Sequence, residues 1–265
     1  MISTIFARGT DTAWQPSVNV SLYQAAAAMN AQARWQESIS DNLAAANLPG
    51  YKKQDVSFEA VQAGLMSQAA PNAQTQFLLP KFVGTTNFSQ GVLRQTGVPT
   101  DVAIDGKGFF EVQLPSGSTA YTRDGEFHLS ASGQLVTKQG YPVLGDSGTI
   151  QLDPNLGGKI TIAATGEISQ GTEVRGKLKV MDFAKPEQLT QISGGFFTNN
   201  DPGMLGSEAT AVSVRSGFLE GSNVSVTTEM ANLIRVMRNF ESNQRTMQVH
   251  NDRLGKAISE LGNPS

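Results

Sequence analysis

Few residues of this chain have the types and spacing that catalysis or ligand binding requires. The run Asp105-Gly106-Lys107-Gly108 has the glycines and the lysine of a phosphate-binding loop. It lacks the G-x-x-x-x-G-K-[ST] spacing, however, and it precedes a strand-like apolar run instead of a helix. Asp101, Asp105 and Asp124 do not form the D-x-[DN]-x-[DN]-G pattern of a calcium loop. Both patterns therefore indicate turns, with a hairpin turn favoured at Asp105-Gly106.

The other candidates for catalysis or metal binding are isolated from one another. His128 and His250 belong to no H-E-x-x-H motif, and Ser116-Gly117-Ser118 lacks the nucleophile-elbow pattern. The chain has no cysteine, which excludes disulfides, thiolate metal sites and a cysteine nucleophile. Trp14 and Trp35 are too scattered to form a stacking platform for bases. We therefore predict no enzyme, no cofactor and no metal, and only a paired-carboxylate site stays open.

Composition limits the classes of partner. The chain has 265 residues and a net charge of −3, so nothing favours binding to nucleic acid. No apolar run is long enough to cross a bilayer, so we expect no direct membrane insertion. The first residues lack the long apolar stretch of a cleavable secretory signal, and we expect none. Residues 1–20 have no clear period and are expected to form a flexible N-terminal tail.

The strongest pattern lies near the C-terminal end. From Val226 to Leu261, apolar residues recur at alternating spacings of three and four, which predicts a long helix with a narrow buried seam. Ser225 is the expected N-cap, and Glu229 lies in the first turn. A core helix of an ordinary globular protein is the alternative. The two seam positions carry Met230, Met237, Gln244, Asn251 and Ile258 on one line, and Leu233, Phe240, Met247, Leu254 and Leu261 on the other.

A second helix is predicted in residues 21–50. Ser21 and Gln24 resemble a capping box at its start. Its small seam residues complement the bulky residues of the C-terminal seam, so we predict that the two helices pair as a coiled coil. The seam positions carry Leu22, Met29, Gln36 and Leu43 on one line, and Ala25, Gln32, Ile39 and Ala46 on the other.

The exit from this helix is marked by its own residues. The helix should end before Pro49, because proline disfavours helix in the preceding residue. Gly50 should supply a backbone angle that other residues avoid. Tyr51 is then expected to anchor the exit by packing, while Lys52 and Lys53 stay hydrated.

The middle of the chain contains two segments of different composition and hydrophobic pattern. Residues 51–81 are polar and predict an irregular, extended connector with a short helix around Phe58–Met66. From residue 82 onward, short apolar or alternating runs between glycine turns predict a unit of β-hairpins. Asp105-Gly106, Asp124-Gly125 and Ser132-Gly133 are expected to supply the positive φ angles of hairpin turns.

The predicted fold class is therefore α+β, with long N- and C-terminal helices pairing as a coiled coil and a mainly antiparallel β domain between them. The predicted boundaries are 1–20 for the flexible tail, 21–50 for the N-terminal core helix, 51–81 for the extended connector, 82–218 for the β-rich outer domain and 219–265 for the C-terminal core helix.

Four blocks of sequence, in this order, resemble the bacterial flagellar rod and hook proteins. Asp41 and Ala45 depart mildly from the family pattern of the first block. The resemblance extends from Leu22 to Leu261, and it is specific for the rod and hook superfamily. The blocks are Asn42-Leu43-Ala44 with Asn47 and Pro49-Gly50-Tyr51-Lys52; Gln90-Gly91, Thr96-Gly97, Asp101-Val102-Ala103-Ile104, Gly106 and Gly108-Phe109-Phe110; Tyr121-Thr122-Arg123-Asp124-Gly125 and Gly133-Gln134-Leu135-Val136; and Gly217-Phe218-Leu219-Glu220-Gly221-Ser222-Asn223-Val224.

This resemblance implies a structural subunit of the flagellar basal-body rod, which polymerises into a helical tube and transmits motor torque. It favours the proximal-rod type over the distal-rod type and, more distantly, the hook protein. The implied partners are further copies of the chain, other rod and hook proteins, the surrounding basal-body rings and the flagellar type III export apparatus. The implied location is the periplasmic rod, reached without a cleaved signal peptide.

The residues expected at the assembly interface come from the two helices and from the turn after the first one. An alternative from another class is a surface adhesin-like β module on a coiled-coil stalk, which predicts a parallel oligomer of one helix type. The expected interface residues are Leu22, Met29, Ile39, Leu43, Pro49, Gly50, Met230, Leu233, Met237, Phe240, Met247, Leu254, Ile258 and Leu261.

Overall fold

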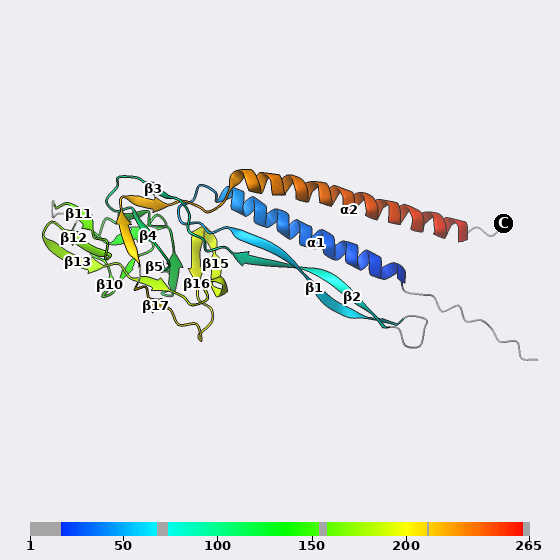
Figure 1. The fold of residues 1–265 in the computed structure, drawn as a ribbon, viewed down its shortest axis with the longest axis horizontal. Helices are drawn as coiled ribbons and strands as arrows, with labels where there is room; N and C mark the ends of the chain where they lie inside the picture. Colours follow the sequence, from blue (N-terminus) through cyan, green and yellow to red (C-terminus); the bar gives the residue numbers. More distant parts are fainter. Residues whose placement is uncertain (1–16, 68–73, 154–157, 211, 262–265) are drawn as a thin grey trace, which may run out of the picture. The chain divides into compact units, whose positions relative to one another are not determined.

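The computed structural model describes residues 17–67, 74–153, 158–210 and 212–261 (Figure 1). These residues divide into two compact units. The first unit contains the described parts of 1–36, 58–83 and 235–265, and the second contains 37–57 and the described parts of 84–234. Most of the predicted tail, residues 1–16, lies outside the described residues.

Two α-helices occur in the described residues, α1 (Ser17–Ala44) and α2 (Val226–Leu261). Helix α2 covers the range predicted from the sequence, and Ser225 lies directly before its first residue. Helix α1 begins before Ser21, so the expected capping box at Ser21 and Gln24 is wrong and both residues lie inside the helix. The chain turns after α1, where Gly50 has a φ of 66°, which confirms the predicted left-handed conformation.

The predicted connector is instead a β-hairpin. Strands β1 (Gln54–Ser67) and β2 (Gln74–Thr86) form a two-stranded sheet, so both the irregular connector and the short helix at Phe58–Met66 are wrong. The reason is visible in the alternation of Val56, Phe58 and Ala60 with polar neighbours, which is the period of a strand. Pro80 is tolerated in β2 because a two-stranded sheet has only edge strands.

The predicted fold class is also wrong. Besides α1 and α2 the described chain is largely β, with strands numbered to β19, and coiled-coil pairing of the helices is not seen. The coiled-coil prediction assumed that both seam lines of α2 face a partner helix. Instead Met230 and Met237 are about half exposed, at 54% and 46%. The residues directly before them, Glu229 and Val236, have buried side chains on this helix instead.

In the first unit, α1 packs against the hairpin through an aromatic contact. The rings of Trp35 and Phe58 meet edge to face with centroids 5.4 Å apart. The amide of Asn243 on α2 donates a hydrogen bond to Gln32 Oε1 on α1, at 3.1 Å. An aromatic contact with a strand and a polar link between helices thus replace the apolar knobs that a coiled coil requires.

The second unit is built around a six-stranded antiparallel sheet with the order β15-β16-β6-β5-β14-β17. Its members are β5 (Phe109–Gln113), β6 (Thr119–Thr122), β14 (Val180–Asp182), β15 (Thr190–Ile192), β16 (Phe196–Thr198) and β17 (Ser207–Glu208). Short 3₁₀ turns at Pro186–Gln188 and Ser193–Gly195 flank β15.

Smaller antiparallel sheets complete this unit. Two pairs join distant parts of the chain, namely β3 (Leu93–Gln95) with β19 (Phe218–Glu220) and β4 (Val102–Asp105) with β18 (Ser213–Ser216). Strands β7 (Phe127–Leu129) and β8 (Leu135–Thr137) form a hairpin. The remaining strands are the pair β9 (Leu144–Gly145) and β10 (Gly148–Thr149), and the triplet β11 (Ile160–Ile162), β12 (Glu167–Gln170) and β13 (Glu173–Lys177).

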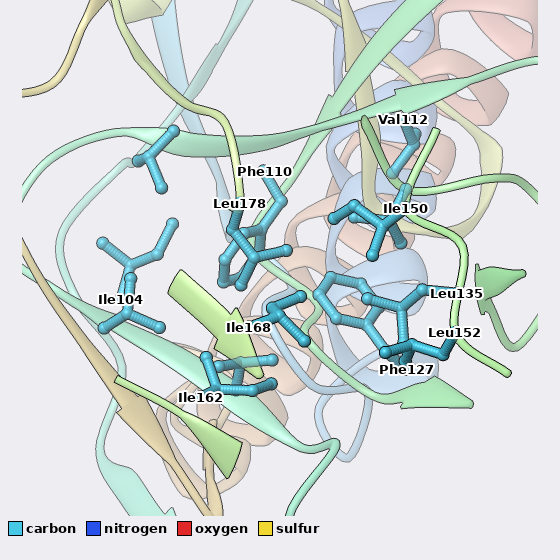
Figure 2. Close-up of a cluster of buried hydrophobic side chains, with 14 of the residues drawn as sticks. Ile104, Phe110, Val112, Phe127, Leu135, Ile150, Leu152, Ile162, Ile168 and Leu178 are labelled. Carbon is cyan, nitrogen blue, oxygen red and sulfur yellow. The ribbon is translucent and has the colours of Figure 1, made fainter. Parts of the chain in front are cut away.

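Strand β5 divides two hydrophobic cores, because successive side chains of a strand point to opposite faces. Phe110 and Val112 enter the larger core, whose aliphatic and aromatic members are shown in Figure 2. Phe109 enters a smaller, mainly aromatic core with Phe197. The other members of this smaller core are Tyr121, Phe183, Leu189 and Met204.

The glycine turns follow the predictions in part. Gly106 and Gly133 have positive φ, as expected, at 117° and 80°. Gly125 does not, and it is needed instead because an added Cβ would lie 1.7 Å from the Val102 carbonyl oxygen. Asp105-Gly106 joins two strands of different sheets, so the predicted hairpin turn there is wrong, whereas Ser132-Gly133 lies in the β7–β8 hairpin.

Candidate functional site

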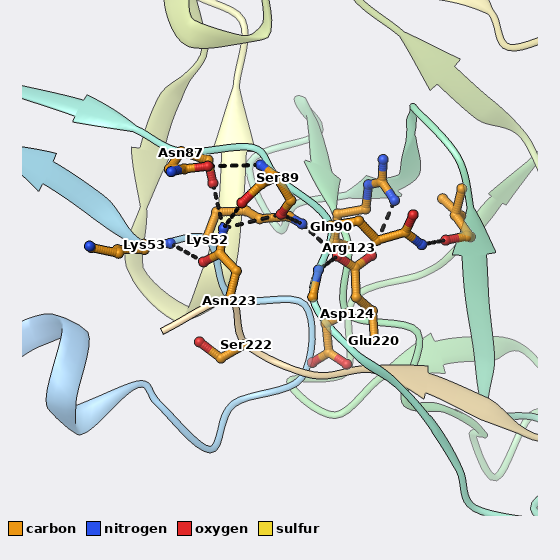
Figure 3. A network of polar contacts seen from close by, with 12 residues as sticks. Lys52, Lys53, Asn87, Ser89, Gln90, Arg123, Asp124, Glu220, Ser222 and Asn223 are labelled. Carbon is orange, nitrogen blue, oxygen red and sulfur yellow. Dashed lines mark hydrogen bonds and ion pairs between the residues drawn. The ribbon is translucent and has the colours of Figure 1, made fainter. Parts of the chain in front are cut away.

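A buried carboxylate in the second unit binds two cationic side chains. Glu220 is fully buried, and its Oε1 lies 2.5 Å from Lys52 Nζ. Its Oε2 lies 3.1 Å from Arg123 Nη1. The backbone N–H of Gly91 also donates to Glu220 Oε1, at 2.8 Å. Because Lys52 and Arg123 are only 1% and 5% exposed, this group, which we call the ion cluster, is shielded from water (Figure 3).

Each member of the ion cluster is held by an element from a different part of the sequence. Lys52 follows the turn after α1, where the Gly50 N–H donates to the Glu220 carbonyl oxygen at 2.7 Å. Arg123 follows β6, and its Nη2 donates to the Gly106 carbonyl oxygen at 2.8 Å. Glu220 ends β19, which pairs with β3. Closing the cluster therefore fixes three distant segments relative to one another within this unit.

Gly50 lies at a close approach between two backbone segments of this arrangement. A Cβ at this position would lie 2.2 Å from both the Arg123 carbonyl carbon and the Asp124 nitrogen. Contacts this short do not occur, so only glycine allows the turn to lie against the Arg123–Asp124 peptide. The positive φ of Gly50 excludes other residues for a second, independent reason.

The charges of the cluster are perturbed by burial. Burial lowers the pKa of Lys52, although the neighbouring Glu220 carboxylate opposes this shift. Burial likewise lowers the pKa of Arg123, again opposed by Glu220. Arg123 also lies over the Phe109 ring, with Cζ 5.4 Å from the ring centroid. One carboxylate therefore compensates two buried cations, which makes Glu220 the residue on which the cluster depends.

Two asparagines extend this network. Asn223 Oδ1 accepts a hydrogen bond from the Lys53 N–H at 2.7 Å, and its Nδ2 donates to the Asn87 carbonyl oxygen at 2.8 Å. Asn42 at the end of α1 accepts from the Gln54 N–H and donates to the Gln54 carbonyl oxygen, both at 2.9 Å. Asn42 thus satisfies both backbone groups of Gln54, as a neighbouring strand would do.

A second ion group surrounds Lys53. Its Nζ lies 2.9 Å from Asp55 and 3.1 Å from Glu229, the buried acid in the first turn of α2. Although partial burial lowers the pKa of Lys53, the hydrogen bonds to Asp55 and Glu229 raise it overall. This pairing ties the start of α2 to the start of β1 within the second unit.

Asp124 is the third charged feature of this region. Burial raises the pKa of its carboxyl group to about 6. Its Oδ1 accepts a hydrogen bond from the Glu126 N–H at 3.0 Å, which lowers the pKa, and the nearby Glu126 carboxylate raises it. Asp124 thus titrates closer to neutral pH than an ordinary aspartate does.

The structure gives different environments to the residues predicted for the assembly interface. Ile39 and Gly50 are buried in the second unit, and Leu43, Pro49 and Leu233 are half-buried there. Met29, Phe240 and Met247 are half-buried in the first unit. Met230 and Met237 are exposed, and the side chains of Leu22, Leu254, Ile258 and Leu261 lie outside the described set.

Sequence reasoning missed the ion cluster. The expectation that Lys52 stays hydrated is wrong, because its ammonium group is buried in an ion pair with Glu220, 168 residues away. No local signal marks the cluster, because Lys52, Arg123 and Glu220 lie in separate blocks of the sequence.

The geometry indicates a structural role for this site. Both carboxylate oxygens of Glu220 are bound by protein groups, namely Lys52, Arg123 and the Gly91 N–H. Among the described residues, no group of three or more histidine, aspartate or glutamate side chains could hold a metal ion. No helix within the described ranges is long and apolar enough to cross a membrane.

Comparison with known proteins gives consistent matches along the chain. The flagellar hook protein FlgE/F/G D1 domain matches residues 103–170, and the flagellar basal body rod FlgEFG protein C-terminal region matches residues 215–260. The flagellar basal-body rod protein FlgG of Borreliella burgdorferi is 32% identical over 259 residues, covering 89% of this chain and 97% of that protein. The flagellar basal-body rod protein FlgF of Caulobacter vibrioides is 33% identical over 227 residues, covering 84% and 90%.

Proposed function

This chain belongs to the flagellar basal-body rod protein family and is a structural subunit of the rod, and we propose that it polymerises there through the exposed face of α2. In this proposal the ion cluster fixes the fold of each subunit, and the helices supply contacts between subunits. The polymer is a helical tube that transmits motor torque. The family is structural and not enzymatic, and the matches do not support the adhesin-like alternative.

The observation that carries this proposal is the exposure of large apolar side chains on α2. Met230 and Ile234, four residues apart on one helix face, are each 54% exposed in the single chain. Soluble proteins keep large apolar patches at surfaces that meet a partner. A neighbouring subunit that covers this face would remove these apolar side chains from water. Because burial of apolar surface is favourable, this contact would stabilise the polymer.

The finer assignments follow from family membership as parts of the same proposal. We propose that the subunit contacts other rod and hook proteins and the basal-body rings, leaves the cell through the flagellar type III export apparatus and lies in the periplasmic rod. Relatives named FlgG and FlgF match the chain at 32% and 33% identity, so the proximal-rod type stays a prediction.

The test is a pair of charged substitutions on the exposed face. Met230→Glu and Ile234→Glu should leave the purified chain folded, because both side chains are largely in solvent. Each should abolish motility in a strain that lacks this rod gene, because a carboxylate would be buried without a partner in the polymer. Val174→Glu in β13, at a residue that is 61% exposed, is the matched control and should restore motility. Full motility of both helix variants would refute the proposal.

A further inference from the structure

The first unit carries a surface groove that its described residues leave unfilled. The groove lies between α1 and the β1–β2 hairpin and has a volume of about 690 Å³. Its lining includes the half-buried Ala27 and the buried Ala31 on α1, and the half-buried Leu79 and Phe82 on β2. Small alanines on one wall allow another helix to approach closely, because the interaxial distance of packed helices depends on the side chains between them.

Two cationic side chains border the same groove. Arg34 of α1 and Lys81 of β2 line it, and both are exposed. Neither has an ion-pair partner within the described part of the chain, and Arg34 Nε donates only to Asn30 Oδ1, at 3.3 Å. The groove therefore fits an occupant with large apolar side chains and a carboxylate that can reach Arg34 or Lys81.

Helix α2 presents such a surface. Met230, Ile234, Met237 and Glu241 follow one another at spacings of four, three and four, which places them on one face of this helix. All four side chains are exposed. We call this face the α2 ridge. It ends in a carboxylate, and Glu241 forms no ion pair among the described residues.

We propose that the α2 ridge of one copy docks into the α1–hairpin groove of a second copy, with Glu241 pairing with Arg34 or Lys81. Neither surface is covered by the described residues of the same chain, and their shapes and charges complement each other, so we assign a second copy as the partner. Because the two surfaces differ, the contact is head to tail, and such a contact produces an open filament when the rotation between copies does not close a ring. The inference rests on the proposed polymerisation and names the surfaces that carry it.

Charge reversal tests the pairing in the full-length chain. Arg34→Glu combined with Lys81→Glu should abolish sedimentable polymer and motility, and Glu241→Arg alone should weaken both, because each places like charges together. The triple variant should recover polymer and motility beyond either parent. Recovery of this kind is not expected from a variant that merely misfolds. If the triple variant is no better than its parents while the unsubstituted chain still polymerises, the pairing is wrong and the proposed function survives.

Cross-linking provides a second measurement, since the chain has no cysteine of its own. A copy with Ala27→Cys is co-expressed with a tagged copy with Met237→Cys, and mild oxidation should give a mixed dimer on a denaturing gel. Ala33→Cys, at an exposed α1 residue that does not line the groove, is the matched control and should give none. Equal dimer yields from Ala27→Cys and Ala33→Cys would overturn the inference. Absence of any polymer from the unsubstituted chain with its rod partners would instead overturn the proposed function.

Discussion

Replacing Glu220 by glutamine should unfold the second unit far more easily than the same change at an exposed glutamate. Glu220→Gln keeps the shape of the side chain and an oxygen that can accept from the Gly91 N–H. It removes the one negative charge that compensates Lys52 and Arg123, which are 1% and 5% exposed. Both cations would then be buried without a counter-ion.

The size of the effect follows from this burial. Removing one partner of a buried ion pair costs about 3–5 kcal/mol, because the remaining charge is left without compensation. Domains have a total free energy of unfolding of about 5–15 kcal/mol, so the loss is a large fraction of it. Glu208→Gln is the control, because Glu208 Oε1 lies 2.7 Å from Lys177 Nζ but both side chains are exposed. That substitution should leave the unfolding midpoint unchanged.

The assay is urea denaturation of both variants, followed by circular dichroism. The midpoint of Glu220→Gln should fall strongly with an unchanged slope, since the surface exposed on unfolding is the same. Because burial lowers the pKa of Lys52, and removal of Glu220 lowers it further, the defect should shrink as pH rises and the amine loses its proton. Equal midpoints for the Glu220→Gln and Glu208→Gln variants would refute the reasoning.

Three further perturbations probe the same region. In thermal unfolding, Gly50→Ala should destabilise the unit far more than the control Gly97→Ala. Both glycines have positive φ, but an added Cβ meets backbone atoms at Gly50 and open space at Gly97. Gly97→Ala should therefore cost only the backbone term of about 1–2 kcal/mol. Burial raises the pKa of Asp124 from 3.8 to about 6, so the folded state binds this proton more tightly than the unfolded state does. The contribution of Asp124 to the free energy of unfolding therefore falls as pH rises through this window. Asp124→Asn should therefore gain up to about 3 kcal/mol over the parent between pH 4 and pH 7, and a constant difference would contradict this. Asn42→Leu should cost about 1–3 kcal/mol in urea denaturation, because it leaves the N–H and carbonyl of Gln54 without partners; an unchanged midpoint would show that water replaces the amide.

The C-terminal helix and the turn after α1 could be predicted because their signals are local. A three-four apolar repeat identifies Val226–Leu261 as helix without knowledge of its surroundings. Pro49-Gly50 identifies the turn and its left-handed residue in the same way, although α1 itself already ends at Ala44. The choice of buried face on α2 could not be predicted, because the sequence does not show that Glu229 would pair with Lys53 and turn Met230 outward.

The ion cluster could not be predicted for a related reason. Lys52 and Glu220 are separated by 168 residues, and a single sequence does not show which distant charges meet. The β1–β2 hairpin was missed for a different reason. Its strand period is confined to a few residues around Phe58, and the polar composition of residues 51–81 as a whole is typical of a connector.

A cryo-electron microscopy map of the assembled rod tests the central claim most directly. We expect Met230, Ile234 and Met237 to be covered by a neighbouring subunit in the polymer. Within each subunit, Glu220 should remain bound to Lys52 and Arg123 of the same chain. A map in which these three apolar side chains face solvent, or in which Glu220 pairs with another subunit, would contradict the account.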